Sequence, residues 1–518
     1  MKTFCIHTLG CKVNQYESEQ IGSLLRARGL TETTADRAEL RIIHTCSVTV
    51  QAASQSRQAV RRMLRLPVLD AHAPAPPAFS CLNHPPKEPP ILGGVKPKVL
   101  VTGCWATSDA SDTTALVGAD AIIGHDRDVA AELDRLLTLW QGSAPQCDSY
   151  PADRHTSGPA TPPRPTDKDD GWMMQAGTAA DHRTPVNKPE SDEKVNEEVA
   201  RGAGTRSLPL LGEHQSGRQR AFLKVQDGCD AHCTYCIIPK LRPVVWSKPI
   251  DDAVEEARRL VTGGHAETVL TGIFLGAYGQ STALRRRQPQ ADQPPLATLV
   301  EALCTRVPEL KRLRLSSLEP GDLTDELVRV LRSHRQVVPH FHLPLQSGSD
   351  ALLRRMNRQY TRDDFLRMLD RVRCAFDRPA LTTDIIVGFP GETNDEFART
   401  LDVVNEARFI HIHAFGFSPR PGTAAARWTK QFVHGPVVNQ RMDRLGELAA
   451  EYSFEYRKQF LGQTVEVVVE RGEREGQRHG RCERYFDVSF HSDHVRAGDL
   501  IRVGVDRVLP EGTWGTAA

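Results

Sequence analysis

Three cysteines near the middle of the chain are the clearest candidates for chemistry. Cys229, Cys233 and Cys236 lie in the segment DGCDAHCTYCIIP, which covers residues 227–239. A structural zinc site normally completes its tetrahedron with four protein ligands, whereas three thiolates on an iron–sulfur cluster leave one iron open to a further ligand. The odd number of thiols and their asymmetric spacing therefore favour a reactive iron–sulfur cluster.

Three more cysteines occupy equivalent positions in the first part of the chain. Cys11, Cys46 and Cys104 each follow an apolar, strand-like run, in TLGCKVNQ, IIHTCSVT and LVTGCWAT respectively. The carboxyl ends of parallel strands lie along one edge of a sheet, where residues far apart in sequence can converge. Any one of these cysteines alone could be a small buried side chain, but three at equivalent positions favour a metal or cluster site. The sequence assigns no role to the other six cysteines, which are Cys5, Cys81, Cys147, Cys304, Cys374 and Cys482.

The elements that must position these cysteines indicate an α/β protein. Residues 1–141 alternate strand-like and helical patterns, which predicts an N-terminal parallel-sheet α/β domain with helices on its faces. Residues 216–452 contain six strand-like runs, most of them followed by a helical pattern, and predict a partial (β/α)6 barrel. The expected strands are 4–10, 40–45, 98–103 and 121–124 in the first domain, and 221–225, 267–272, 312–317, 340–345, 381–389 and 410–418 in the second. The expected helices are 14–29, 50–64 and 127–140, then 251–264, 296–307, 324–334, 361–376 and 394–407.

The end of the chain has a different texture. Residues 456–515 form short alternating runs separated by Gly, Asp and His, which predicts a small all-β barrel of about five strands. Its acidic and basic residues nearly cancel. The basic and aromatic side chains of this segment could contact a base or a phosphate, or they could simply form a solvated barrel surface. These side chains are Arg481, Arg484, Tyr485 and Phe486.

Two low-complexity stretches interrupt the regular pattern. Residues 69–94 are rich in proline and predict a surface insertion in the first domain. Residues 142–215 are rich in Pro, Ser, Thr, Asp, Lys and Gly, with few apolar runs. Such a segment buries too little apolar surface to order itself, so a flexible linker is expected.

Composition narrows the class of protein. The chain has 518 residues, enough for several domains, and 66 Lys and Arg balance 65 Asp and Glu. No global basic field therefore indicates a nucleic-acid partner, and any RNA binding must be local. Twelve cysteines are too few for a disulfide scaffold, and no signal peptide or membrane-spanning run is evident. A cytoplasmic protein with reduced thiols and no membrane partner is expected.

The cysteine motifs resemble a known family. Cys229, Cys233 and Cys236, with Tyr235 before the last cysteine, resemble the radical S-adenosylmethionine (SAM) signature. With TLGCKVNQYESEQ, TCSVT, VTGC, LPLQSGSDALLRRMNRQYTRDDF and TDIIVGFPGET, the chain resembles the methylthiotransferases of this class in nearly every folded segment. TLGCKVNQYESEQ is most similar to the branch that acts on N6-threonylcarbamoyladenosine beside the tRNA anticodon. The C-terminal barrel resembles the RNA-binding TRAM module of that family.

The resemblance implies two cofactor sites and a reaction. A [4Fe–4S] cluster on Cys229, Cys233 and Cys236 would bind SAM, and electron transfer would cleave it to a 5′-deoxyadenosyl radical. Carbon 2 of adenine needs such an agent, since its hydrogen is neither acidic nor open to simple replacement. A second [4Fe–4S] cluster, on Cys11, Cys46 and Cys104, would carry the sulfur that a second SAM methylates. The implied partners are the anticodon stem-loop of tRNA and an electron-donor protein such as flavodoxin or ferredoxin.

Further positions at strand ends are weaker candidates. The expected cofactor-binding residues are Tyr235, Thr271, Gly272, Glu319, Gln346 and Ser347, and Asp384 lies near the same face. Each could be merely structural. Asn14, Gln15 and Glu17 follow Cys11 and could either shape the sulfur site or cap the next helix.

Two departures from the family pattern stand out. Asn-Thr usually precedes the second cysteine motif, but here His44 occupies the first of these positions, and histidine can hydrogen-bond a neighbour or ligate a metal. After Cys236 the family usually carries Arg-Gly and then Arg-Ser. This chain has LRPVVWSKP instead, with Pro243 and Trp246 in place of the Gly and the second Arg, which bears on the local loop geometry.

Other functions stay open from the sequence. One is the same chemistry on another substrate, either isopentenyladenosine in tRNA or a ribosomal protein. Another is a non-catalytic, metal-binding RNA protein. Zinc in a colourless protein would favour the binding protein, whereas iron and sulfide near two clusters per chain would favour an enzyme.

Overall fold

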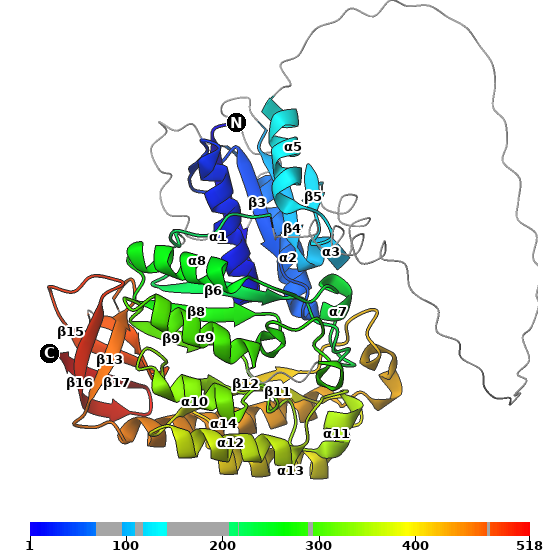
Figure 1. The fold of residues 1–518 in the computed structure, drawn as a ribbon. Helices are drawn as coiled ribbons and strands as arrows, with labels where there is room; N and C mark the ends of the chain where they lie inside the picture. Colours follow the sequence, from blue (N-terminus) through cyan, green and yellow to red (C-terminus); the bar gives the residue numbers. More distant parts are fainter. Residues whose placement is uncertain (69–95, 109–117, 142–206, 216, 289–293, 474–476) are drawn as a thin grey trace, which may run out of the picture.

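The computed structural model describes most of the chain, in three consecutive domains (Figure 1). The described residues are 1–68, 96–108, 118–141, 207–215, 217–288, 294–473 and 477–518. The expected insertion at 69–94 and most of the expected linker at 142–215 lie outside them. In Figure 1 the N-terminal domain is blue to cyan, the central domain runs from green to yellow, and the C-terminal barrel is orange to red.

The N-terminal domain is a five-stranded, entirely parallel sheet in the order β2-β1-β3-β4-β5. Its strands are β1 (Thr3–Thr8), β2 (Thr31–Glu32), β3 (Leu40–Thr45), β4 (Lys98–Gly103) and β5 (Ala121–Ile123). Its helices are α1 (Lys12–Ala27), α2 (Val50–Arg65), α3 (Cys104–Ser108) and α5 (Val129–Gln141). Every residue of β3 is buried, as expected for a central strand covered on both faces. The predicted α/β domain is confirmed.

The central domain contains all six expected barrel strands. They form two parallel sheets, β6-β8-β9 and β10-β11-β12, which an isolated bridge between Leu313 and Val337 brings together. The strands are β6 (Arg220–Asp227), β8 (Glu267–Gly272), β9 (Arg312–Leu315), β10 (His340–His342), β11 (Ala380–Val387) and β12 (His411–Gly416), and a short β7 (Trp246–Ser247) pairs antiparallel with β6.

Helices cover the outside of this open barrel. They are α7 (Ile238–Leu241), α8 (Ile250–Thr262), α9 (Pro295–Arg306), α10 (Asp325–Ser333), α11 (Asp350–Arg355), α12 (Arg362–Ala375), α13 (Asn394–Ala407) and α14 (Gly435–Lys458). Short 3-10 turns cover Leu275–Ala277, Arg285–Arg287, Ala425–Arg427 and Thr429–Gln431. Thr361 and Thr393 begin α12 and α13 with capping boxes, in which side chains satisfy the free amides of the first turn. The predicted partial barrel is confirmed, while the short helices α7 and α11, the long helix α14 and strand β7 were not among the expected elements.

The C-terminal segment is a closed five-stranded barrel, as predicted. Its order is β13-β14-β15-β17-β16, with strands β13 (Thr464–Val469), β14 (Arg478–Cys482), β15 (Asp487–His491), β16 (Leu500–Leu509) and β17 (Gly512–Ala517). Alternate residues such as Val467, Val469 and Phe490 fill its core. The chain enters this barrel from α14, so the expected domain boundary between 452 and 456 falls inside a helix.

Residues 207–215 correct one expectation. They were expected to form the end of a flexible linker. Instead, Leu208 is buried in the core of the N-terminal domain and Leu211 in the core of the central domain. Gln20 of α1 donates to the Pro209 carbonyl at 2.8 Å, which ties the segment to the first domain. Leu208 and Leu211 help to order this stretch, because each buried leucine contributes roughly 1.5–3 kcal/mol.

The basic and aromatic side chains of the C-terminal barrel also differ from expectation. Tyr485 stacks on His340 of β10, with ring centroids 4.1 Å apart, and Arg484 donates to the backbone carbonyls of Asp377 and Arg378. Phe486 is in the barrel core. Tyr485 and Arg484 therefore attach the barrel to the central domain instead of forming a free surface, whereas the partly buried Arg481 pairs with Asp487 at 2.8 Å within the barrel.

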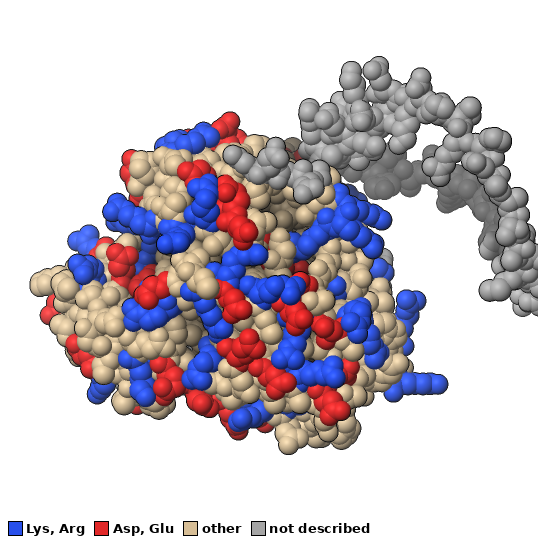
Figure 2. All heavy atoms as spheres, turned by 60° about the horizontal axis from the view of Figure 1, so that its bottom comes forward, with Lys and Arg blue, Asp and Glu red and all other residues tan. Residues whose placement is uncertain are grey.

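The surface carries both signs of charge. Figure 2 shows Lys and Arg interspersed with Asp and Glu over the face it presents, in keeping with the balanced composition. Among the described residues, no helix combines the length and the apolar character that crossing a membrane requires.

Candidate functional site

The sheet edge of the N-terminal domain brings the first three cysteines together. Strands β1, β3 and β4 are neighbours, and Thr45 pairs with Gly103 in the parallel register. Cys46 and Cys104 directly follow these paired residues, and Cys11 is the residue that precedes the first turn of α1. The convergence expected from the strand ends is therefore present in the structure.

Two residues hold the loops of this first triad in close contact. Gly10 has φ +95°, and a Cβ placed on it would lie 2.8 Å from Cys46 Sγ, so only glycine fits. The Asn14 side-chain amide donates to the carbonyls of Leu9 and Thr45, each at 2.9 Å. Asn14 thus shapes the cysteine site rather than capping α1, whose N-terminus has no side-chain cap.

The electrostatics of the first triad suit a cationic ligand. The pKa of Cys104 is raised to about 12, mainly by burial, which outweighs the lowering effect of Arg242, with smaller contributions from the nearby Cys11 and Cys46. Burial likewise raises the pKa of Cys46. Buried thiols with raised pKa values, such as those of Cys46 and Cys104, become thiolates when a metal ion or cluster lies beside them. This donor set fits an iron–sulfur cluster.

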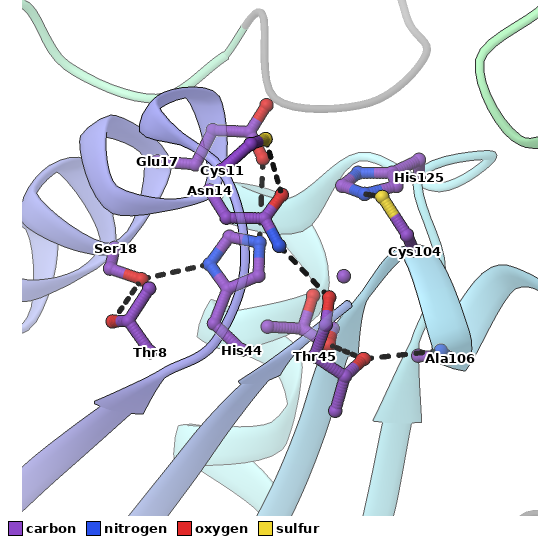
Figure 3. Close-up of polar contacts among 12 residues, drawn as sticks. Thr8, Cys11, Asn14, Glu17, Ser18, His44, Thr45, Cys104, Ala106 and His125 are labelled. Atoms are coloured by element: carbon purple, nitrogen blue, oxygen red, sulfur yellow. Dashed lines mark hydrogen bonds and ion pairs between the residues drawn. The ribbon is translucent and has the colours of Figure 1, made fainter. Parts of the chain in front are cut away.

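A buried polar network lies directly behind this triad (Figure 3). His125, in the loop after β5, has its Nε2 atom 3.7 Å from Cys104 Sγ. His44 places Nδ1 2.9 Å from the Ser18 hydroxyl and Nε2 3.4 Å from Glu17 Oε2. The histidine that replaces the family's usual asparagine is therefore a hydrogen-bonding member of this network.

Glu17 is the centre of the network and is already paired. Its carboxylate accepts from Lys224 Nζ at 2.6 Å and from both terminal nitrogens of Arg242 at 2.8 Å. Burial alone would raise the pKa of Glu17, but these two cations hold it well below its usual range. Although ligand atoms of Glu17, His44 and His125 lie within 4.8 Å of one another, a further cation there would compete with Lys224 and Arg242, so the network is not a metal site of its own.

The second triad lies in the loop after β6, at the carboxyl end of the barrel strands. His232, between the first two cysteines, has φ +52°, and Asn357 fixes this turn by donating to the carbonyls of Ala231 and His232 at 3.2 and 3.1 Å. The backbone amide of Thr234 donates to the Met356 carbonyl at 3.0 Å. The segment RRMNRQY at 354–360 therefore holds the cysteine loop in place.

The three sulfurs of this triad border a cavity of about 130 Å³. Arg358 donates to Cys233 Sγ at 3.3 Å, and the amide of Ala231 donates to Cys229 Sγ at 3.5 Å. Burial raises the pKa of both Cys229 and Cys236 to about 12. Hydrogen-bond donors aimed at sulfur and three cysteines around one cavity suit thiolates on a cluster, so this triad also fits the expected group.

The other expected cofactor-binding residues fall into two groups. Tyr235 and Glu319 line the cavity, and Glu319 pairs with Arg358 and, at 3.2 Å, with Arg285. The remaining four lie at neighbouring strand ends but outside the described cavity lining. Thr271 is buried at the end of β8, Gly272 packs against Gln226, Gln346 has φ +61° and accepts from Ile386, and Ser347 is fully buried with its hydroxyl 3.4 Å from that of Thr400.

Asp384 and the altered loop after Cys236 have clear structural roles. Asp384 lies 3.2 Å from His342 Nε2 on the adjacent strand. The loop with Pro243 and Trp246 folds back on β6. Trp246, in β7, pairs with Asp227 at the end of β6. The substitutions in this loop therefore leave it packed against the strand that leads to the second triad.

Several site residues were missed by sequence reasoning. Arg242, His125, Asn357 and Arg358 contact the cysteines or hold their loops. Asn357 and Arg358 lie in a segment that carried the family resemblance, and Arg242 precedes Pro243 in the altered loop, but no role was assigned to any of the four. His125 follows β5, so the rule that parallel strand ends share one edge would have included it. The other three act through long-range contacts that spacing does not reveal.

Comparisons with known proteins agree with this arrangement. Residues 223–404 match the radical SAM superfamily, and residues 3–74 match uncharacterized protein family UPF0004. The threonylcarbamoyladenosine tRNA methylthiotransferase MtaB of Bacillus subtilis is 31% identical, over 98% of this chain and 94% of its own length. The protein of the same name from Chlamydia pneumoniae is 32% identical, over 99% of this chain and 97% of its own length.

A solved structure shares the fold. The radical SAM methyltransferase TsrM of Kitasatospora setae has a TM-score of 0.50 and 11% identity, and the match covers 82% of this chain and 75% of that one. With the cysteine loop at the carboxyl face of an open barrel, these matches define a radical SAM enzyme. The chain belongs to the methylthiotransferase family within that class. As a member of this family it is a transferase that uses SAM and [4Fe–4S] clusters.

Proposed function

We propose that this protein transfers a methylthio group to carbon 2 of N6-threonylcarbamoyladenosine in tRNA, next to the anticodon. The observation that carries the proposal is the pair of three-cysteine sites, one at the sheet edge of the N-terminal domain and one at the barrel face of the central domain. The named activity of the full-length relatives supports the choice of substrate. In this proposal domains 1–141, 216–452 and 456–515 supply the sulfur site, the radical site and an RNA-binding module.

The second triad would hold the cluster that binds SAM. Cys229, Cys233 and Cys236 would be its ligands, and the bound group supplies a carbon-centred radical strong enough to remove hydrogen from an aromatic ring. Arg358 would stabilise the Cys233 thiolate through its hydrogen bond, and the buried surroundings would exclude water. The cofactor-binding residues proposed around it are Tyr235, Thr271, Gly272, Glu319, Gln346 and Ser347.

The first triad would hold the sulfur-carrying cluster. Cys11, Cys46 and Cys104 would be its ligands. Because Cys11 is exposed while the other two are buried, the substrate would approach the cluster from the side of Cys11. Gly10 and Asn14 would keep the ligand loops in place. We further propose that the protein works in the cytoplasm, where a flavodoxin or ferredoxin would supply the electron and the anticodon stem-loop of tRNA would be the substrate.

Nucleoside analysis of tRNA tests the function directly. Total tRNA from cells with the gene, without it, and complemented with variants is digested and analysed by mass spectrometry. The 2-methylthio derivative of threonylcarbamoyladenosine should be present only with wild type and with Cys374→Ala, a matched control in which an exposed helix cysteine is removed. Cys46→Ala and Cys233→Ala should both abolish it.

Three outcomes would count against the proposal. Loss of the isopentenyladenosine derivative instead would place the enzyme in another branch of the family. Unchanged tRNA with an altered ribosomal protein would do the same. Survival of the product in either triad variant would remove that triad from the reaction.

A further inference from the structure

One arginine joins the two cysteine sites. Arg242 lies six residues after Cys236, and its backbone carbonyl accepts from the amide of Cys229 at 3.1 Å. Its guanidinium reaches in the other direction, into the N-terminal domain, where it contacts Glu17 and donates to His125 Nε2 at 2.9 Å. A single residue therefore touches the backbone of one triad and the polar network behind the other.

The contacts of this guanidinium restrict its orientation. It pairs with Glu17 through two parallel hydrogen bonds of 2.8 Å, and one of its nitrogens also contacts both carboxylate oxygens of Asp227 at 2.8 and 2.9 Å. Glu17 is on α1, which begins beside Cys11, and Asp227 ends β6, which leads to Cys229. A two-point contact between planar groups specifies angle as well as distance.

The path continues to the first triad through His125. Its Nε2 accepts from Arg242 and also lies 3.7 Å from Cys104 Sγ, and its own ring is 6.3 Å from that of His44. The Arg242 side chain is only 3% exposed, so water does not loosen these contacts. The connection from Cys229 to Cys104 thus runs through the backbone and the buried side chain of Arg242 and then through the partly buried ring of His125.

Charge alone does not require an arginine here. Lys224 already places a cation 2.6 Å from Glu17 and 2.5 Å from Asp227. A lysine at 242 would add a second point charge without the planar fork, whereas arginine fixes the relative orientation of its partners. Geometry, rather than neutralisation, is what Arg242 adds to the network.

We propose that Arg242 is a positioning residue that sets the separation and orientation of the two cysteine triads. The inference deepens the proposed function and rests on it for its link to catalysis, because transfer from one site to a substrate activated at the other requires a defined spacing. A misplacement of about 1 Å can lower the rate of a positioned reaction roughly 100-fold.

The test uses the full-length protein, reconstituted without oxygen. The variants are Arg242→Lys, Arg242→Gln, and the double variant Arg242→Gln/Glu17→Gln, which removes both charges so that neither is left buried alone. Arg441→Gln is the matched control for Arg242→Gln, because Arg441 is also a buried arginine paired with a buried carboxylate, Glu392 at 2.6 Å, and its hydrogen bonds go to Glu392 and Asn394 rather than to a residue of either triad. Each protein is assayed for iron content and, by electron paramagnetic resonance, for the magnetic interaction between the reduced clusters. The two products, 5′-deoxyadenosine and methylthiolated tRNA, are also measured.

Wild type and Arg441→Gln should show two clusters whose spins interact. The double variant should keep both clusters and still form 5′-deoxyadenosine from SAM near the wild-type rate, but with a weakened spin interaction and about 100-fold less methylthiolated tRNA. Arg242→Lys should keep the fold, but its spin interaction between the two clusters should stay close to that of Arg242→Gln. Arg242→Gln alone should resemble the double variant in its spin interaction.

An unchanged spin interaction in folded, two-cluster variants would overturn the inference, as would full rescue by lysine. The resonance measurement contains no tRNA, so it decides the role of Arg242 separately from the substrate. If wild type showed the interaction but methylthiolated no tRNA, the proposed function would fail and the positioning role would stand.

Discussion

At the scale of single residues, the two cysteine sites depend on close backbone approaches as much as on sulfur. Gly10 adopts φ +95°, and an added Cβ would meet Cys46 Cβ at 2.7 Å. Gly29 also has a left-handed φ of +81°, but nothing lies within 4 Å of the position of its Cβ. The two glycines therefore share the same backbone demand and differ only in what surrounds them.

This contrast leads to a matched prediction. Gly29→Ala should cost only the left-handed strain, about 1–2 kcal/mol of unfolding free energy, and keep both clusters. Gly10→Ala carries the same strain and must also displace Cys46, so it should lose the cluster of the first triad. Iron analysis after anaerobic reconstitution measures the difference, and equal iron in the two variants would show that Gly10 does not shape the site.

The sequence was most informative about residues with distinctive chemistry. All six proposed cysteine ligands were identified from spacing and from strand ends, because thiols at equivalent positions are improbable by chance. Arg242 and Arg358 were not, since arginine is common and the contacts of Arg242 with Glu17 and of Arg358 with Cys233 join positions more than 100 residues apart. Ser347 was included for its position near a strand end, but its side chain is occupied by Thr400 and the amide of Ser349.

At the scale of elements, the strands and helices that position the cysteines followed from hydrophobic pattern. The exceptions have physical causes. Helix α14 buries one stripe at helical spacing, Arg441, Leu445, Leu448, Tyr452 and Tyr456, but the arginine and the two tyrosines reduce its apolar character. Strand β7 is two residues long and exists because it pairs with the end of β6.

Strand β9 docks the C-terminal barrel through buried charge. Arg314 pairs with Glu267 at 2.7 Å and donates to the carbonyls of Cys482 and Glu483, each at 3.3 Å, and Arg312 lies 3.3 Å from the same glutamate. Burial alone would raise the pKa of Glu267, but Arg314, Arg220 and Arg312 hold it at about 2, below the usual 4.5. Glu267 thus orients the arginines that hold the barrel.

A depressed pKa has a defined effect on stability. The contribution of Glu267 should be complete above about pH 4.5 and should be lost as the pH falls toward about 2, because the unfolded chain binds a proton that the folded chain resists. A single such proton changes the unfolding free energy by at most about 1.4 kcal/mol per pH unit. Urea unfolding of wild type and Glu267→Gln between pH 2 and 6 should give a shallower dependence in the variant. Parallel curves would show that Glu267 is not a charged partner of the arginines.

At the scale of the whole molecule, the sequence could not reveal how the domains contact one another. Residues 207–215 connect the first two cores although they end a low-complexity stretch, and Tyr485 faces the central barrel although its sequence context suggested a free surface. Both arrangements depend on surfaces far apart in the chain. The interdomain network around Glu17 is the clearest case, because its members are unremarkable singly and acquire a role only when the domains meet.

The central claim is that each of the two triads holds its own [4Fe–4S] cluster. Mössbauer spectroscopy on anaerobically reconstituted, iron-57-labelled protein tests it most directly. We expect two [4Fe–4S] clusters per wild-type chain, one in Cys46→Ala, one in Cys233→Ala and none in the double variant. A single cluster in wild type, or a protein that binds zinc and no iron, would contradict the account.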